Sequence, residues 1–348
     1  MIQVAAPSSI RDALERHGTT REDVLDALGL LPGARVLLVG DFIADWYTYC
    51  TAIGKTSKTP TLSVKRGPTD RFWGGSGLFA TNLLGLGAIV EYVTVCGDDW
   101  GAGYLMREPP ANLSLHVVVD PTRPTTIKER FWVDGYKLLQ VDTLENAYVP
   151  VSVHEQVAGA VAASIGGCDL VLTSDSRHGM MSPELIQLMK RICREHGKPL
   201  VVDTQVSNRR GNVDEYCGVD LICANETEAR DCIRDERCGH DVLLDKLRDC
   251  LRVRRVIIKL GLDGLMGFDE RERAFRLPAV PVDVRDPIGS GDAFLSAAAL
   301  TFRPQVKVMA SMFIAACAGA LAVTKMGTVP NTLAELSGFV ERTLDDVF

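Results

Sequence analysis

Two glycines and an aspartate precede an alanine-rich apolar segment near the end of the chain, in the run DPIGSGD over residues 286–292. The following segment, Ala293 to Phe302, is predicted to be a helix. A glycine-rich turn that opens a helix directs backbone N–H groups and the positive end of the helix dipole at one point, which suits a phosphate. Asp292 is suited to take a proton from a hydroxyl that attacks this phosphate, so the run predicts phosphoryl transfer to an alcohol. The N–H groups expected to form the anion hole are those of Gly289, Ser290 and Gly291.

Asp292 could equally be an ordinary residue of a helix N-terminus, with the glycines only permitting the turn. Short glycine motifs match by chance in many proteins, so this run alone would favour that simpler interpretation. Three further segments, all upstream in the chain, carry residues suited to the same chemistry. Their presence favours phosphoryl transfer.

The first of these segments places two carboxylates, Asp41 and Asp45, after the short apolar run from Val36 to Val39. Such a run predicts a buried strand. Ligands bind beyond the carboxyl ends of strands in open α/β sheets, so we expect both acids near a ligand. Turn or cap aspartates are the alternative interpretation.

The second segment, GGSGLFATNLLGLGA over residues 74–88, begins with Gly74 and Gly75. Glycines without a Cβ let the backbone approach a ligand closely, although an ordinary turn before a helix would also use them. A helix is predicted from about Leu78 to Leu86. The third segment is NETE over residues 225–228, after an apolar strand, where Asn225 and Glu228 could also form a capping box.

Taken together, these segments resemble the signatures of ribokinase-like (PfkB-family) sugar kinases. The run at 286–292 is similar to the family's D-T-x-G-A-G-D, the run at 74–88 to G-G-x-x-N-x-A-x-N-x-x-x-L-G-A, and the run at 225–228 to N-x-x-E. The resemblance extends from about Arg35 to Leu336. Within the family, the chain looks most like the D-glycero-D-manno-heptose-7-phosphate kinases, through the segments 39–49, 124–142, 172–179 and 325–328.

The resemblance implies ATP-dependent phosphorylation of a sugar hydroxyl, with ATP and Mg²⁺ as cofactors. The expected hydroxyl is the anomeric one of a heptose 7-phosphate, giving the 1,7-bisphosphate; another small sugar, sugar phosphate or nucleoside is the alternative. Asp292 is the expected catalytic base, and Asn225 and Glu228 are expected to organise water around the magnesium. The residues expected to bind the substrate are Asp41, Asp45, Gly74, Gly75, Asn82, Lys128, Arg130, Asp175, Arg177 and His178. Those expected to bind the nucleotide are Asn225, Lys259, Gly261 and Gly264.

Several of these assignments have simpler alternatives. Gly261 and Gly264 could belong to a plain hairpin, and Lys128 and Arg130 could be charged surface residues. The chain also departs from the heptose-kinase pattern where the sugar is bound. Leu78 replaces an asparagine, and His178 replaces a lysine.

Apolar strands and predicted helices alternate from Arg35 onward, which indicates a mostly parallel sheet with helices on both faces. We therefore expect an α/β, ribokinase-like fold with a small β-sheet lid, formed by segments of about 46–73 and 125–142. Residues 1–32 are expected to form a helical extension and residues 33–348 the kinase domain. The lid segments contain several aromatic residues, which either pack on the body of the protein or form an exposed dimer face. They are Trp46, Tyr47, Phe72, Trp73, Phe131 and Trp132.

Composition narrows the class of partner. The chain has 348 residues and a net charge of −7, without a basic stripe, so nucleic acid is not an expected partner. No apolar run is long enough to span a membrane. The 10 cysteines are scattered, which suggests reduced thiols and a cytoplasmic location. The expected partners are thus the sugar, ATP and a second copy of the chain, joined through the lid.

Overall fold

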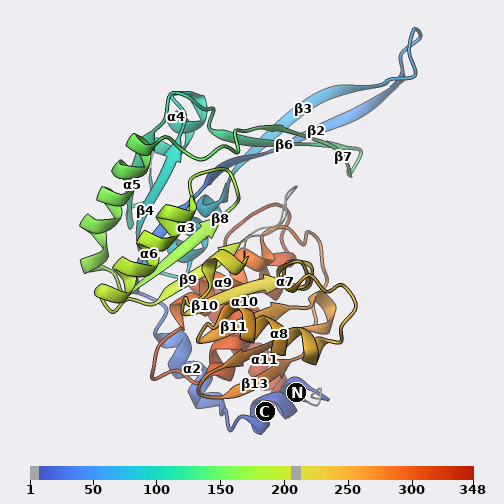
Figure 1. The fold of residues 1–348 in the computed structure, drawn as a ribbon. Coiled ribbons are helices and arrows are strands. Elements are labelled where there is room, and N and C mark those ends of the chain that lie inside the picture. The colour runs from blue at the N-terminus through green and yellow to red at the C-terminus, as the bar shows by residue number, and fades with distance from the viewer. Residues whose placement is uncertain (1–7, 108, 205–212) are drawn as a thin grey trace.

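The apolar runs form the expected strands in the computed structural model, which describes residues 8–107, 109–204 and 213–348 (Figure 1). The large sheet contains β1 (Arg35–Gly40), β4 (Ile89–Cys96), β5 (Leu113–Val119), β8 (Leu170–Asp175), β9 (Leu200–Thr204), β10 (Leu221–Asn225), β11 (Arg255–Lys259), β12 (Leu265–Asp269) and β13 (Arg273–Leu277). Their order is β13-β12-β11-β10-β9-β8-β1-β4-β5. All neighbours pair in parallel except β11–β12 and β12–β13, so the sheet is mostly parallel.

Helices cover both faces of this sheet, because its strands are apolar on both sides. Along β1, Val36 and Leu38 join one hydrophobic core, whereas Leu37 and Val39 join the other. The first core is covered by α1 (Ile10–Arg16), α2 (Arg21–Gly29), α3 (Ser76–Gly85), α4 (Trp100–Met106), α9 (Ser290–Leu300), α10 (Val308–Val323) and α11 (Leu333–Val347). The second is covered by α5 (Val151–Ser164), α6 (Pro183–Glu195), α7 (Glu226–Ile233) and α8 (His240–Leu251). In the described residues, no helix is both long and apolar enough to cross a membrane.

Some boundaries differ from the expected ones. Helix α9 begins at Ser290, so Asp292 lies inside its first turn and not ahead of the helix. Polar residues are tolerated there because the first N–H groups of a helix need no intrahelical acceptor. Helix α3 likewise begins at Ser76. Strands β5, β12 and β13 were not predicted. Strands β5 and β13 are the two edges of the sheet, and their partly exposed residues interrupt any continuous buried run.

The two helices of the N-terminal extension pack on the body of the kinase domain. Leu14 of α1 and Val24 of α2 are fully buried in the same core as α10. Thr20 caps α2 in the predicted capping box with Asp23. The Nζ atom of Lys307 lies 2.8 Å from a carboxylate oxygen of Asp23, which ties the extension to the start of α10. The described part of the extension thus shares its core with the kinase domain.

A second, smaller sheet forms the lid. Its strands are β2 (Phe42–Lys55), β3 (Leu62–Gly75), β6 (Thr126–Val133) and β7 (Tyr136–Thr143), in the order β3-β2-β6-β7. The predicted hairpin turn at Asp134 and Gly135 is present, with both residues at positive φ. Figure 1 shows the β2–β3 ribbon projecting well beyond the body. The first lid segment is longer than 46–73, because β2 follows β1 after a single residue.

The lid aromatics mainly pack within the lid and against the body. Tyr47 is fully buried, so an exposed dimer face is the wrong interpretation for this residue. Its ring centroid lies 5.3 Å from that of Phe72 and 6.0 Å from that of Trp132. Trp46 contacts Trp100 of α4, edge to face at 5.3 Å. These contacts hold the base of the lid against the body.

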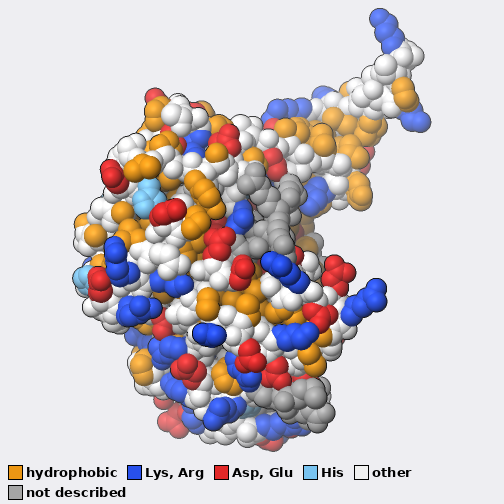
Figure 2. Space-filling view, viewed as in Figure 1, with side chains coloured by type: hydrophobic (Ala, Val, Ile, Leu, Met, Phe, Trp, Pro, Cys, Tyr) orange, Lys and Arg blue, Asp and Glu red, His pale blue; other side chains and the backbone are white. Residues whose placement is uncertain are grey.

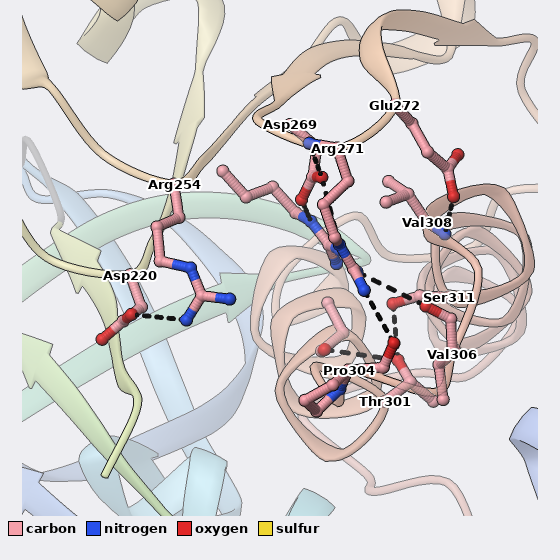
Figure 3. A network of polar contacts seen from close by, with 12 residues as sticks. Asp220, Arg254, Asp269, Arg271, Glu272, Thr301, Pro304, Val306, Val308 and Ser311 are labelled. Atoms are coloured by element: carbon pink, nitrogen blue, oxygen red, sulfur yellow. Dashed lines mark hydrogen bonds and ion pairs between the residues drawn. The ribbon is translucent and has the colours of Figure 1, made fainter. Parts of the chain in front are cut away.

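A polar network lies around the start of β11 and the end of β12 (Figure 3). Arg255, at the start of β11, is buried, and its Nε lies 2.9 Å from a carboxylate oxygen of Asp269. Arg271 donates to the carbonyl of Pro304 at 2.7 Å, and Arg254 pairs with Asp220 at 3.0 Å. Removing one partner of a buried pair costs about 3–5 kcal/mol, so a substitution of Arg255 or Asp269 alone should be strongly destabilising.

Candidate active site

The turn before α9 is held by the carboxylate of Asp286. One of its oxygens accepts the N–H of Ile288 at 3.0 Å, and the other accepts the N–H of Gly327 at 3.1 Å. Gly289 then adopts a left-handed conformation, with φ of +82°, and forms the N-cap of α9 without a side-chain hydrogen bond. A helix N-terminus without a capping side chain keeps its N–H groups available to an anion.

A cavity of about 530 Å³ opens beside this turn. Ser290 and Gly291 lie at one end of it, and Gly261 and Gly264 border it on the side of β11 and β12. Most of its wall is apolar and includes Leu262, Leu265, Val280, Val282, Phe294 and Ala320. Gly264 has φ of +84°, and a Cβ there would clash with the carbonyl of Leu277, so this glycine is also needed for the turn itself. Such a volume suits a small-molecule ligand with a flat apolar part.

Asp292 and Lys259 face each other across the first turn of α9. Burial raises the pKa of Asp292 to about 6, although the charge of Lys259 lowers it and that of Glu228 raises it further. Burial also lowers the pKa of Lys259, but the negative groups around its ammonium raise it by more, to above its ordinary value. The Cys223 thiol contributes only when it is ionised, and burial raises its pKa to about 12, so the negative groups near neutral pH are the carboxylates of Asp203, Glu228 and Asp292. Lys259 therefore stays charged among several acids.

Asn225 and Glu228 form the capping box of α7. The side-chain oxygen of Asn225 accepts the N–H of Glu228 at 2.8 Å, and Glu228 Oε2 accepts the N–H of Asn225 at 2.8 Å. The capping box, which was the alternative interpretation of this pair, is thus present. Glu228 is buried and its charge acts on both Asp292 and Lys259, so it also belongs to the site.

Asp41 is buried and organises the loop after β8. Its carboxylate accepts the backbone N–H groups of Ser176 at 3.1 Å, His178 at 3.3 Å and Met180 at 3.2 Å. Burial, together with the charge of Asp175, raises the pKa of Asp41 to about 7, despite these three donors. The carboxylate thus supports the loop that presents the expected sugar-binding residues.

That loop contains three of the expected substrate residues. Asp175 accepts the N–H of Arg177 at 2.9 Å and the hydroxyl of Tyr216 at 3.0 Å. Arg177 adopts φ of +64°, and its Nη1 atom lies 3.8 Å from a carboxylate oxygen of Glu215. The remaining member, His178, contacts the side-chain oxygen of Asn146 through Nδ1 at 2.8 Å.

The lid contributes Asp45, Lys128 and Arg130, and it brings two of them together. Asp45 lies within lid strand β2, not at the end of β1, and it forms an ion pair with Arg130. Arg130 also lies over the ring of Tyr47, at 5.5 Å from its centroid. Burial lowers the pKa of Lys128, whereas the charges of Asp142 and Asp41 raise it. The expected phosphate contacts therefore have acidic neighbours already.

The glycines and the asparagine of the second motif have structural contacts. Gly75 has φ of +55°, and a Cβ there would lie 2.5 Å from the carbonyl oxygen of Asp41. A Cβ on Gly74 would lie 3.2 Å from the Cβ of Asp45. Glycines at both positions therefore leave room for the close contacts where the lid meets α3. Asn82 is buried and donates to the carbonyl of Leu78, one turn earlier in α3, at 3.0 Å.

Sequence reasoning missed several residues of the site. Tyr216 supports Asp175 from a separate segment, and nothing in its local sequence signals this. Asp286 is the first residue of the glycine motif at 286–292, so its role in that turn could have been predicted from its position. Leu78, noted only as a departure, has a role in packing: a Cβ on Gly289 would lie 3.1 Å from its Cδ2 atom.

A cavity and a helix N-terminus without a capping side chain, beside a mostly parallel sheet, are typical of α/β proteins that bind an anionic ligand. The model of the pfkB family of carbohydrate kinases matches residues 34–334, and the chain belongs to that family. It is therefore a sugar kinase, a phosphotransferase that acts on a sugar.

Similar curated proteins carry the name bifunctional protein HldE. The one from Bradyrhizobium diazoefficiens is 29% identical over 322 residues, which is 89% of this chain and 64% of the relative. The one from Campylobacter jejuni is 26% identical over 308 residues, which is 88% of this chain and 64% of the relative. The chain thus spans less than two thirds of the length of these relatives.

Solved structures confirm the expected ribokinase-like fold. Phosphofructokinase-2 from Escherichia coli, in complex with fructose-6-phosphate, superposes with a TM-score of 0.72 at 16% identity, covering 89% of this chain and 99% of that one. Ribokinase from Arabidopsis thaliana, complexed with ribose and ATP, gives a TM-score of 0.68 at 16% identity, with coverage of 89% and 99%. At such identities the likeness shows the fold alone.

Proposed function

We propose that this sugar kinase transfers the terminal phosphoryl group of ATP to the anomeric hydroxyl of a heptose 7-phosphate. The observation that carries the proposal is Asp292 in the first turn of a helix that no side chain caps, beside a cavity of about 530 Å³. The similarity to HldE proteins over most of the chain supports a heptose phosphate. Leu78 and His178 depart from that pattern, and this favours another small sugar, sugar phosphate or nucleoside as the alternative substrate.

The residues divide the work of the reaction. The apolar wall of the cavity takes the base of ATP, and the N–H groups of Ser290 and Gly291 receive its phosphates. Asp292 accepts the proton of the attacking sugar hydroxyl as general base. The lid covers the sugar and excludes water, which would otherwise hydrolyse ATP.

A substrate screen tests the proposal directly. ADP formation is measured with heptose 7-phosphate, fructose 6-phosphate, ribose and adenosine as acceptors. We expect the highest kcat/KM with heptose 7-phosphate. A higher kcat/KM with one of the others would establish the alternative substrate, and no turnover with any sugar would contradict the proposal as a whole.

Magnesium on ATP fits the residues present. Glu228 is a buried carboxylate whose charge acts on Lys259 and Asp292, and its Oε2 atom accepts the N–H of Asn225 in the capping box. Oxygen donors such as this carboxylate and the amide of Asn225 suit Mg²⁺ and its bound waters. The ion would supply positive charge to the phosphates of ATP.

Replacing Glu228 by Gln is expected to raise the magnesium concentration needed for half-maximal activity. The amide keeps an oxygen for the N–H of Asn225 but loses the charge, so Tm should change little. A magnesium titration and a thermal melt check this. Glu335→Gln is the matched control, because Glu335 fills the same place in the capping box of α11. A lower Tm with an unchanged magnesium requirement would mean that Glu228 only caps its helix.

Activity should fall in acid. A general base works only as a carboxylate, and the pKa of Asp292 is raised to about 6. We therefore expect kcat/KM to be constant above about pH 7 and to fall about tenfold for each unit below about pH 6. A profile from pH 5 to 8, with the thermal melt recorded at each pH, checks this. A flat profile down to pH 5 would be inconsistent with Asp292 as the base.

The lid supports pairing with a second copy of the chain. Apolar side chains lie along the projecting sheet (Figure 2), and β7 is an edge strand with unpaired backbone groups on one side. The exposed apolar residues of the lid are Ile53, Leu62, Tyr136, Leu138, Leu139 and Val141. Sedimentation should report a dimer that Leu139→Lys and Val141→Lys together convert to a monomer. A monomeric wild type would rule out this arrangement.

A further inference from the structure

The ammonium of Lys259 reaches the first turn of α9. Lys259 ends β11 and lies in register with Asn225, which ends the neighbouring strand β10. A Cβ added to Gly291 would lie only 2.7 Å from Lys259 Nζ, so the ammonium occupies the space above this glycine. Lys259, Ser290 and Gly291 also line the same cavity. The ammonium and the backbone N–H groups of α9 thus converge at one place.

The N-terminus of α9 carries partial positive charge, and the ammonium adds a full charge beside it. The acids Asp203, Glu228 and Asp292 keep the ammonium charged, since they raise the pKa of Lys259. A phosphate between the ammonium and the helix would receive charge-assisted hydrogen bonds from both sides.

We propose that Lys259 is a catalytic residue that contacts the transferred phosphoryl group itself. The inference rests on the proposed function. In the reaction, the bond from the terminal phosphorus to the bridging oxygen of ATP breaks, and a bond from that phosphorus to the sugar oxygen forms. The hydroxyl proton passes to Asp292, while ADP leaves with the bridging oxygen. Lys259 exchanges no proton and stabilises the charge on the phosphoryl oxygens during transfer.

Lys259→Met removes the charge and keeps a side chain of similar length. We expect kcat to fall roughly a hundredfold, since a donor aimed at the transition state contributes about that much. KM for ATP should change less, because the base and sugar of ATP bind elsewhere in the cavity. Lys190→Met, on α6 over the other face of the sheet from α9, is the matched control and should keep wild-type kinetics.

A binding measurement separates this role from a plain nucleotide contact. Lys259→Met should weaken binding of the non-hydrolysable β,γ-imido analogue of ATP by roughly tenfold, and leave the affinity for ADP unchanged, because ADP lacks the terminal phosphoryl group. Equal affinities for the analogue in the wild type and the variant, with kcat also retained, would overturn the proposal. A loss of ADP affinity equal to the loss for the analogue would overturn it too.

Gly291→Ala provides a second variant, in case Lys259→Met does not fold. The added methyl group occupies the space of the ammonium without removing its charge, and it should lower kcat and the affinity for the analogue together. Wild-type values in this variant would overturn the proposal. If the wild type itself phosphorylates no sugar, the proposed function fails, whereas an active wild type with a fully active Lys259→Met variant refutes only the role of Lys259.

Discussion

Asp292→Asn is expected to reduce kcat by at least roughly a hundredfold. The amide keeps the shape of the side chain in the first turn of α9 but cannot accept the hydroxyl proton. Asp292 also carries no capping duty in α9, whose N-cap is Gly289, so the fold should tolerate the change. Steady-state kinetics with the best acceptor from the screen measure the effect.

Binding and stability measurements complete this test. ATP affinity and Tm of Asp292→Asn should remain near the wild-type values, because the amide is of equal size and the acids Asp203 and Glu228 still surround the ammonium of Lys259. Asp346→Asn, at an exposed position of α11, is the control for an Asp-to-Asn change without a functional role. Near-wild-type turnover of Asp292→Asn would remove this residue from the role of base.

A phosphate on the sugar, far from the reacting hydroxyl, is expected to improve binding strongly. The lid and the loop after β8 supply cations at Lys128, Arg130 and Arg177, and charge-assisted contacts contribute about 1.5–3 kcal/mol each. Arg130 already pairs with Asp45, and Arg177 lies near Glu215. Within the described residues, Lys128 has no ion-pair partner inside 4.0 Å, which makes it the first candidate for the phosphate.

Lys128→Met should therefore raise KM for the phosphorylated sugar about tenfold or more, because about 1.4 kcal/mol corresponds to a factor of ten. KM for the unphosphorylated form of the same sugar should be unaffected, and kcat should change less than KM if the contact is equally strong in the ground and transition states. Lys137→Met, on the exposed strand β7 of the same lid, controls for a lost lid charge. Equal kcat/KM for the two sugar forms in the wild type would refute a phosphate pocket.

Local sequence determined the elements and the chemistry of the α9 turn. Apolar runs of four to six residues specified strands such as β1, β8 and β10, because a strand buried on both faces needs continuous apolar side chains. The glycines of the run at 286–292 indicated the turn before α9, because a glycine readily adopts the left-handed backbone of that turn. The acid Asp292 indicated proton transfer, because a carboxylate can accept a proton. The Asp134–Gly135 hairpin and the Thr20 capping box are equally local, so they could be predicted from neighbouring residues.

Tertiary structure alone decided which distant side chains meet. The chain distance from Asp41 to the loop at 176–180 is more than 130 residues, and no periodicity relates them. Asp45 pairs with Arg130, and Asp175 with Tyr216, although each pair is also far apart in the sequence. Asp45, Arg130 and Asp175 were expected to contact the sugar, and the structure shows that they have protein partners. Lys259 meets Gly291 because β11 ends where α9 begins. Such contacts depend on how sheet and helices pack, and packing is a property of the whole chain that patterns within a short segment do not contain.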